Sequence, residues 1–289
     1  MKVFDDLRRR YDEAQSPARR LEKQTDADTR ARLAAAVPYL AGVWRPSAEP
    51  PGVGPGARFR VATYNVHRWT GVRGGRAFVP ERAISVLARL DADVIALQEV
   101  LLPFDDPALL ERAAERLGLH VAFAATRIHR RGELGNALLT RWPFASVLTI
   151  DLSRGRLEQR SALAIELRTE HAPVPRVSVV ATHLALVDRT RKHQVMSLLE
   201  HPQLHAPVVL LGDMNAWRRC PATRELDAAF VDEDHHNRAW PATFPAPRPV
   251  LALDRIYARG ARIDALEAAT VADARIASDH LPVVATVTL

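Results

Sequence analysis

The chain of 289 residues has 47% hydrophobic and 26% charged side chains, ordinary values for a globular protein with one large or two small domains. Its only cysteine, Cys220, excludes an internal disulfide, and no stretch reaches the roughly 20 apolar residues of a membrane-spanning helix. The charged N-terminus lacks the apolar segment of a secretory signal, so we expect a cytoplasmic protein.

The net charge of +6 and the isoelectric point of about 10.0 have two explanations. An anionic partner, such as nucleic acid or a phospholipid surface, would account for them. A compositional bias would also account for them, since the only lysines are Lys2, Lys23 and Lys192 and the rest of the Lys+Arg total is arginine. The arginines are scattered along the sequence rather than clustered, which favours the compositional explanation.

Three parts of the chain differ in composition. Residues 1–44 are predicted to form a polar helical extension, because their apolar residues are too sparse for an independent core. The segment 45–57 is rich in proline and glycine and is predicted to be a linker. We expect the main domain to span residues 58–289.

Within the main domain, short β-rich runs alternate with a few helices. Pro80 begins the first predicted helix, where its missing N–H would be unpaired in any case. A second helix runs from Pro107 to Leu117 and is stopped by Gly118, and a third covers 188–200. Strands are predicted at 59–65, 93–100, 119–124, 135–141, 146–151, 160–168, 176–183, 208–213, 253–258, 261–271 and 281–289. Because most neighbouring strands lack a helix between them, we expect two sheets packed face to face with helices outside.

Several apolar strands run into side chains that bind metal ions or move protons. These are Asn65, Glu99, Asn136, His183, Asp213, Asn215, Asp254, Asp279 and His280. A buried strand that runs into a carboxylate is unfavourable unless the charge is compensated, and a metal ion surrounded by such strand ends compensates it. One such residue alone would more often be a solvated loop residue, but their repetition in one domain favours a shared site.

Seven segments carry a more specific pattern. In chain order they are VATYNVHR, DVIALQEV, GNALLTRWP, VVATHLAL, VVLLGDMNAW, LALDRIYARG and IASDHLPVV. The chain from residue 58 onward therefore resembles the endonuclease/exonuclease/phosphatase superfamily, which includes deoxyribonucleases, abasic-site endonucleases, inositol polyphosphate 5-phosphatases and bacterial sphingomyelinases. The resemblance implies an α/β fold in which 58–289 is the catalytic domain, a four-layer sandwich of two mostly antiparallel sheets flanked by helices.

The resemblance also implies a divalent metal ion. Glu99 matches the metal-binding glutamate of the family, and Asp279 matches a second metal carboxylate or a group that steers the water shell. Asn65 would touch the metal through its carbonyl or orient a water on it. Hard oxygen ligands of this kind suit Mg²⁺ or Mn²⁺.

A proton-moving pair is implied as well. Asp254 matches the carboxylate partner of His280, and such a carboxylate fixes the tautomer of the imidazole and raises its basicity. Asp213 is the other candidate for activating water. The sequence leaves the choice between Asp213 and His280 open.

Four further residues are candidates for contacts with a phosphate group. By resemblance, His183 would donate to a non-bridging oxygen, and Asn215 would hydrogen-bond a phosphate oxygen. Asn136 and Arg160 are candidates for substrate binding, although such residues are also common without a function. Trp217 could line the substrate groove, but packing in the core is the more usual role of a tryptophan.

These residues predict hydrolysis of a phosphate ester by a metal-positioned water. A covalent intermediate is not expected, because no serine or cysteine lies in a nucleophile motif. We expect a phosphodiesterase acting on nucleic acid or on a phospholipid head group. The alternatives are a phosphomonoesterase acting on a small metabolite and a non-catalytic accessory protein that retains the fold. The complete residue set argues against the accessory protein.

Overall fold

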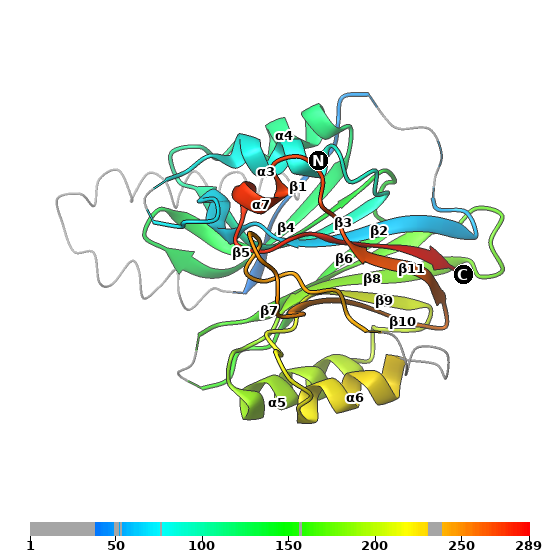
Figure 1. The fold of residues 1–289 in the computed structure, drawn as a ribbon. Helices are drawn as coiled ribbons and strands as arrows, with labels where there is room; N and C mark the ends of the chain where they lie inside the picture. Colours follow the sequence, from blue (N-terminus) through cyan, green and yellow to red (C-terminus); the bar gives the residue numbers. More distant parts are fainter. Residues whose placement is uncertain (1–37, 49–51, 53, 76, 156–157, 231–238) are drawn as a thin grey trace.

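The computed structural model describes residues 38–48, 52, 54–75, 77–155, 158–230 and 239–289. Two β-sheets pack face to face, and helices cover their outer faces (Figure 1). This arrangement confirms the α/β sandwich that the sequence predicts. Within the described ranges, no helix is long and apolar enough to cross a membrane.

The larger sheet has seven strands in the order β1-β4-β5-β3-β2-β12-β11. They are β1 (Tyr39–Trp44), β2 (Arg58–Asn65), β3 (Val94–Pro103), β4 (His120–His129), β5 (Gly132–Thr140), β11 (Arg262–Ala268) and β12 (Val283–Thr288). Only β2 and β3 are parallel neighbours; the other pairs are antiparallel. In the parallel pair, Asn65 lies opposite Gln98, which brings it next to Glu99.

The smaller sheet has five strands in the order β10-β9-β8-β7-β6. They are β6 (Ser146–Asp151), β7 (Ser161–Arg168), β8 (Arg176–His183), β9 (Val208–Asp213) and β10 (Asp254–Arg259). Here β8 and β9 are the parallel pair, and their last residues, His183 and Asp213, lie opposite each other. Strand β10 is antiparallel to β9, so its first residue, Asp254, also pairs with Asp213.

Helices cover the two outer faces (Figure 1). On the larger sheet lie α3 (Pro80–Leu87), α4 (Leu109–Leu117) and α7 (Ala274–Ala277); on the smaller sheet lie α5 (Asp188–Leu199) and α6 (Pro221–Phe230). A short 3₁₀ helix, η1 (His67–Trp69), follows β2. As the sequence predicts, Pro80 is the first residue of α3, and Gly118 ends α4 in the left-handed conformation (φ 61°).

Apolar side chains fill the space between the sheets and beneath the helices. Val61 and Val283 of the larger sheet meet Leu163, Val179 and Leu211 of the smaller sheet in one buried cluster. Because this central cluster fixes how the sheets stack, it also fixes how their polar ends are placed relative to each other.

One predicted boundary is wrong. Tyr39–Trp44 form the edge strand β1 rather than the end of the predicted helical extension over 1–44. Leu40 and Val43 pack on the cluster between the sheets, and Tyr39 and Trp44 pack on the cluster beneath the helices. The strand forms because its backbone pairs with β4. This pairing is long-range, so no local sequence pattern reveals it. Residues 1–37 of the predicted extension lie outside the described residues.

Candidate active site

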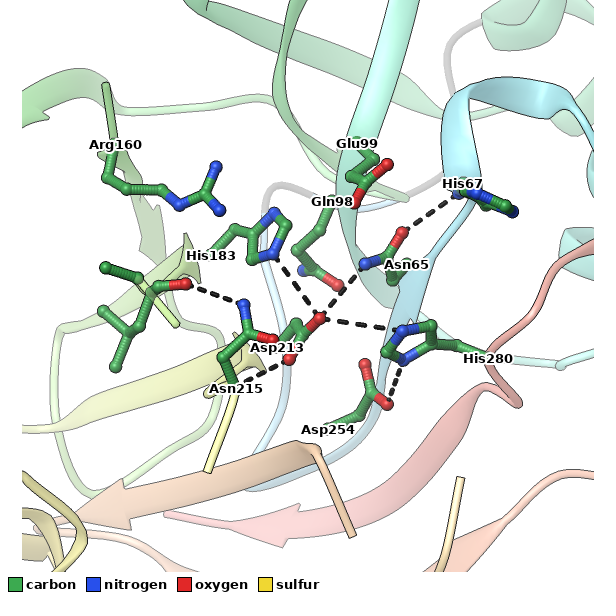
Figure 2. Close-up of polar contacts among 12 residues, drawn as sticks. Asn65, His67, Gln98, Glu99, Arg160, His183, Asp213, Asn215, Asp254 and His280 are labelled. Carbon is green, nitrogen blue, oxygen red and sulfur yellow. Dashed lines mark hydrogen bonds and ion pairs between the residues drawn. The ribbon is translucent and has the colours of Figure 1, made fainter. Parts of the chain in front are cut away.

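Polar side chains from both sheets meet at one edge of the sandwich (Figure 2). Asn65 ends β2 of the larger sheet, while His183 and Asp213 end β8 and β9 of the smaller sheet. Asp254 begins β10, and His280 comes shortly before β12. The strand directions therefore bring together residues that are far apart in the sequence.

Glu99 reaches this edge through a β-bulge. Leu97 pairs with Ala137 and Val100 with Gly135, so Gln98 and Glu99 together lie opposite Asn136. Glu99 has a positive φ of 52°, a conformation that is rare outside glycine and asparagine. The bulge interrupts the alternation of the strand and re-aims the Glu99 carboxylate toward the site (Figure 2).

Gly212 permits the close packing of β8 and β9 just before Asp213. A Cβ atom at this position would lie 1.9 Å from the carbonyl oxygen of Thr182, and φ is +154°. Only glycine avoids this overlap. The glycine of the GDMN segment is therefore required by the approach of the strand that carries His183.

Asp213 is the centre of the hydrogen-bond network (Figure 2). Its Oδ2 accepts a hydrogen bond from Nδ2 of Asn65 at 3.1 Å, and its Oδ1 accepts one from the backbone N–H of Asn215 at 2.8 Å. The Nε2 atoms of His183 and His280 lie 3.5 and 3.8 Å from the same Oδ2. The buried carboxylate is thus held by two N–H donors and faces two imidazoles.

His280 and Asp254 form the predicted pair. Nδ1 of His280 lies 2.8 Å from Oδ2 of Asp254, which also accepts the hydroxyl hydrogen of Thr243 at 2.5 Å. Burial opposes a charge on His280, but the carboxylates of Asp254 and Asp213 outweigh it and raise the pKa of His280 to about 10. The imidazole is therefore a cation, and the ring of Phe244 packs beside it at 5.0 Å between centroids.

His183 has the opposite electrostatic character. Burial, reinforced by the positive charge of Arg160, lowers its pKa to about 3 despite the nearby Asp213. Its imidazole is therefore neutral, with one N–H to donate. The two histidines that face Asp213 thus differ in charge.

Of the carboxylates predicted for the site, Glu99 and Asp279 remain partly exposed, with 23% and 24% of their side chains accessible. Glu99 lies 3.4 Å from Nε of Arg68, and Asp279 lies 3.3 Å from Nδ1 of His67. Burial raises the pKa of Asp279, and the negative charge of Glu99 also raises it. The nearby His280 and His67 lower this pKa but do not outweigh the other two effects. Carboxylates whose charges repel are the type of ligand that suits a hard divalent cation.

A second group of residues also has ligand atoms close together. Each of Asp213, Asp254 and His280 offers one ligand atom, and these three atoms all lie within 4.8 Å of one another. Most of these atoms already have partners, because Oδ2 of Asp254 bonds His280 and Thr243, and both oxygens of Asp213 accept N–H bonds. We therefore interpret this group as a hydrogen-bonded network.

The network forms the floor of a cavity of about 210 Å³. Arg160 lines it with its side chain only 9% exposed, and its Nε has no hydrogen-bond partner in the described part of the chain. Glu158 holds a terminal nitrogen of Arg160 at 2.8 Å and one of Arg127 at 3.0 Å. Asn136 is anchored by its Nδ2, which donates to the Ser161 carbonyl at 2.9 Å. This wall is suited to binding an anion.

Most of the residues predicted for the site line this cavity. Its lining includes Asn65, Glu99, Asn136, Arg160, His183, Asp213, Asn215 and His280. Asp254 is fully buried behind His280, and Asp279 lies beside His67. Arg68, Arg127 and Glu158 also line the cavity but were not predicted, because no motif in the sequence separates them from solvated charged residues.

Comparison with known proteins identifies the family of the chain. Residues 62–280 match the model of the Endonuclease/Exonuclease/phosphatase family, and the chain belongs to this family. Members of the family are hydrolases that act on phosphoester bonds.

Three similar proteins illustrate the relationship. The uncharacterized protein YbhP of Escherichia coli strain K12 is 29% identical over 247 residues, which cover 80% of this chain and 96% of YbhP. An endonuclease/exonuclease/phosphatase structure from Beutenbergia cavernae has a TM-score of 0.62 at 23% identity, covering 80% of this chain and 72% of that one. TDP2 from D. rerio, complexed with a single-strand DNA product, has a TM-score of 0.59 at 17% identity, covering 80% and 99%.

Proposed function

We propose that the protein is a Mg²⁺- or Mn²⁺-dependent phosphodiesterase that cleaves its ester by direct attack of water. The proposed substrate class is nucleic acid or a phospholipid head group. The observation that carries the proposal is the position of Asp213 at the floor of the cavity, fixed by Asn65 and Asn215 and facing His183 and His280. A carboxylate fixed in this way can accept a proton from an attacking water.

The proposed cation would be held by Glu99 and Asp279, with Asn65 beside it. When bound, the ion supplies positive charge next to the phosphate oxygens and makes a coordinated water more acidic. The amide of Asn65 already donates to Asp213 and accepts the His67 backbone N–H at 3.0 Å. These contacts support an orienting role for Asn65 between the cation site and Asp213.

The remaining residues are assigned to the phosphate group. His280 is held as a cation between two carboxylates, so its proposed role is to stabilise developing negative charge rather than to act as the base. His183, which is neutral, would donate an N–H to a non-bridging oxygen. Arg160, whose buried Nε lacks a partner in the described residues, and Asn215 would bind further phosphate oxygens.

The test compares a diester with a monoester. Hydrolysis of bis-p-nitrophenyl phosphate and of p-nitrophenyl phosphate would be measured with Mg²⁺, with Mn²⁺ and with a chelator, for the wild type and His280→Gln. We expect metal-dependent turnover of the diester that exceeds turnover of the monoester and falls in His280→Gln. Turnover of the monoester alone would establish a phosphomonoesterase instead, and equal rates in the chelator would contradict the metal requirement.

A further inference from the structure

The exposed apolar side chains have an unusual distribution. Five large apolar side chains are exposed among the described residues, and each lies within four positions of a residue assigned to the site. They are Leu186 (59% exposed), Val187 (51%), Trp217 (50%), Val250 (74%) and Ile276 (47%). A single exposed apolar residue needs no explanation. The restriction of these five side chains to the loops of one site does need one.

The four loops that carry these side chains leave the same edge of the sandwich. Two of them follow β8 and β9, whose carboxyl ends lie side by side because the strands are parallel. The third precedes β10, which is antiparallel to β9, and the fourth contains α7 and precedes β12. In Figure 1, α7 and the starts of α5 and α6 lie toward the end of the sheets opposite the C-terminus.

Neighbouring loops in this set are also in contact. The guanidinium of Arg191 lies 5.8 Å from the ring of Trp217 and donates to the carbonyls of Ala185 and Leu186, which joins the first two loops. The guanidinium of Arg275 donates to the carbonyls of Ala246 and Pro247, which joins the last two. Leu186 itself lines the cavity, so the first of these loops reaches the site directly.

Exposed arginines accompany the apolar side chains. Arg189, Arg219, Arg248 and Arg275 are all exposed, and each lies within two positions of one of the five apolar residues. Arg218 meets the same condition but is paired with Asp188 at 3.1 Å. In the described parts of the same loops, Asp273 is the one acidic residue that is exposed. We call these five apolar and four arginine side chains the rim. The exposed surface of these four loops is therefore both apolar and positively charged.

We propose that the rim docks the protein on an anionic phospholipid membrane, with its apolar side chains in the headgroup–acyl boundary and its arginines at the lipid phosphates. Apolar side chains beside cationic ones are the combination that binds such an interface. A tryptophan suits the boundary because its ring is apolar and its N–H is polar. The docking itself needs only the rim. The further step, in which the cavity of the docked protein binds the phosphodiester of a phospholipid, rests on the proposed function.

The identity of the apolar residues favours lipid over nucleic acid. Single-stranded nucleic acid is held by aromatic side chains on which its bases stack. Four of the five exposed apolar residues are aliphatic (Leu186, Val187, Val250 and Ile276), and Trp217 is the one aromatic residue. Aliphatic side chains offer no stacking surface but enter hydrocarbon readily.

The fluorescence of Trp217 provides a direct measurement of docking. Of the five tryptophans of the chain, it is the one that is exposed. Vesicles of phosphatidylcholine mixed with phosphatidylglycerol, vesicles of phosphatidylcholine alone, and a single-stranded oligothymidylate would each be added to the full-length protein. We expect flotation with the mixed vesicles, together with a blue shift of the fluorescence that is absent in Trp217→Ser.

Matched variants separate the rim from total charge. The double variant Trp217→Ser/Val250→Ser should weaken partition into mixed vesicles by about tenfold or more. Arg248→Ser should weaken it as well, whereas Arg58→Ser, which removes the same charge at the far end of β2, should not. Unchanged thermal unfolding would show that each variant is folded.

Three outcomes would overturn the proposal. These are failure to float with mixed vesicles, equal partition of the double variant and the wild type, and a Trp217 signal that follows the oligonucleotide but not the vesicles. Partition is measured without turnover, so a protein that floats but hydrolyses no ester would contradict the proposed function and not the docking.

Discussion

Nδ2 of Asn65 donates a hydrogen bond of 3.1 Å to Oδ2 of Asp213, and this contact joins the two sheets at the edge where the site lies. Asn65 ends β2 of the larger sheet, and Asp213 ends β9 of the smaller one. Both residues are buried. The position of the proposed base therefore depends on how the two sheets stack, and not on either sheet alone.

Replacing Asn65 with alanine should disturb Asp213 without unfolding the protein. The substitution removes one of the two N–H donors that hold the carboxylate. We expect kcat for bis-p-nitrophenyl phosphate to fall by about 10²-fold with a smaller change in KM, as for a group that acts in the transition state. A kcat within about twofold of the wild type would contradict this role.

Arg191 should be important for both stability and activity. It is buried in α5, and its Nη1 donates to the carbonyls of Ala185 at 2.8 Å and Asn215 at 2.7 Å, which positions the loops after β8 and β9. Arg191→Met leaves these carbonyls unpaired, so we expect a loss of about 3 kcal/mol in the free energy of unfolding, measured with urea. Arg189→Met, the same change at an exposed position of α5, should leave stability nearly unchanged.

Glu133, a buried acid of β5, should make the stability of the protein depend on pH. Burial raises its pKa, although the hydroxyl of Tyr39 donates to it and acts in the opposite direction. An acid whose pKa is higher in the folded state destabilises the fold once it is ionised, so stability falls as the pH rises through that pKa. Glu133→Gln should therefore be more stable than the wild type at pH 7, with the difference vanishing on acidification. Equal stability at both pH values would contradict the assignment.

The sequence predicts the strands well, and most of the residues it singles out lie together at one edge of the structure, because each follows or precedes an apolar run. The runs before Asn65, His183 and Asp213 became β2, β8 and β9 with bounds within one residue of those expected. Helix α6 and strand β1 were missed. Both depend on packing partners elsewhere in the chain, which hydrophobic periodicity does not reveal.

Other features of the site could not be predicted from sequence because they are long-range. The bulge that turns Glu99 toward the site depends on its pairing with β5. Thr243, which donates to Asp254, and Arg191, which joins two loops, lie in segments without a motif. Trp217 was expected in the core but is half-exposed, since it lies in the loop after β9 rather than on a strand.

Metal affinity distinguishes the two possible cation sites. If Glu99 and Asp279 hold the ion, Glu99→Gln should weaken Mn²⁺ binding by about 10-fold or more, measured by titration calorimetry, because a charged ligand is lost. His280→Gln should retain the affinity of the wild type. The reverse result would place the ion in the group formed by Asp213, Asp254 and His280.

The central claim is that Asp213, fixed between the two sheets, enables water to attack a phosphate ester in this cavity. Its most direct test is the rate of bis-p-nitrophenyl phosphate hydrolysis by Asp213→Asn at saturating Mn²⁺, with folding checked by circular dichroism. We predict a loss of about 10²–10⁴-fold in kcat, the contribution of a positioned base. A folded Asp213→Asn protein that turns over the ester at the wild-type rate would contradict the account.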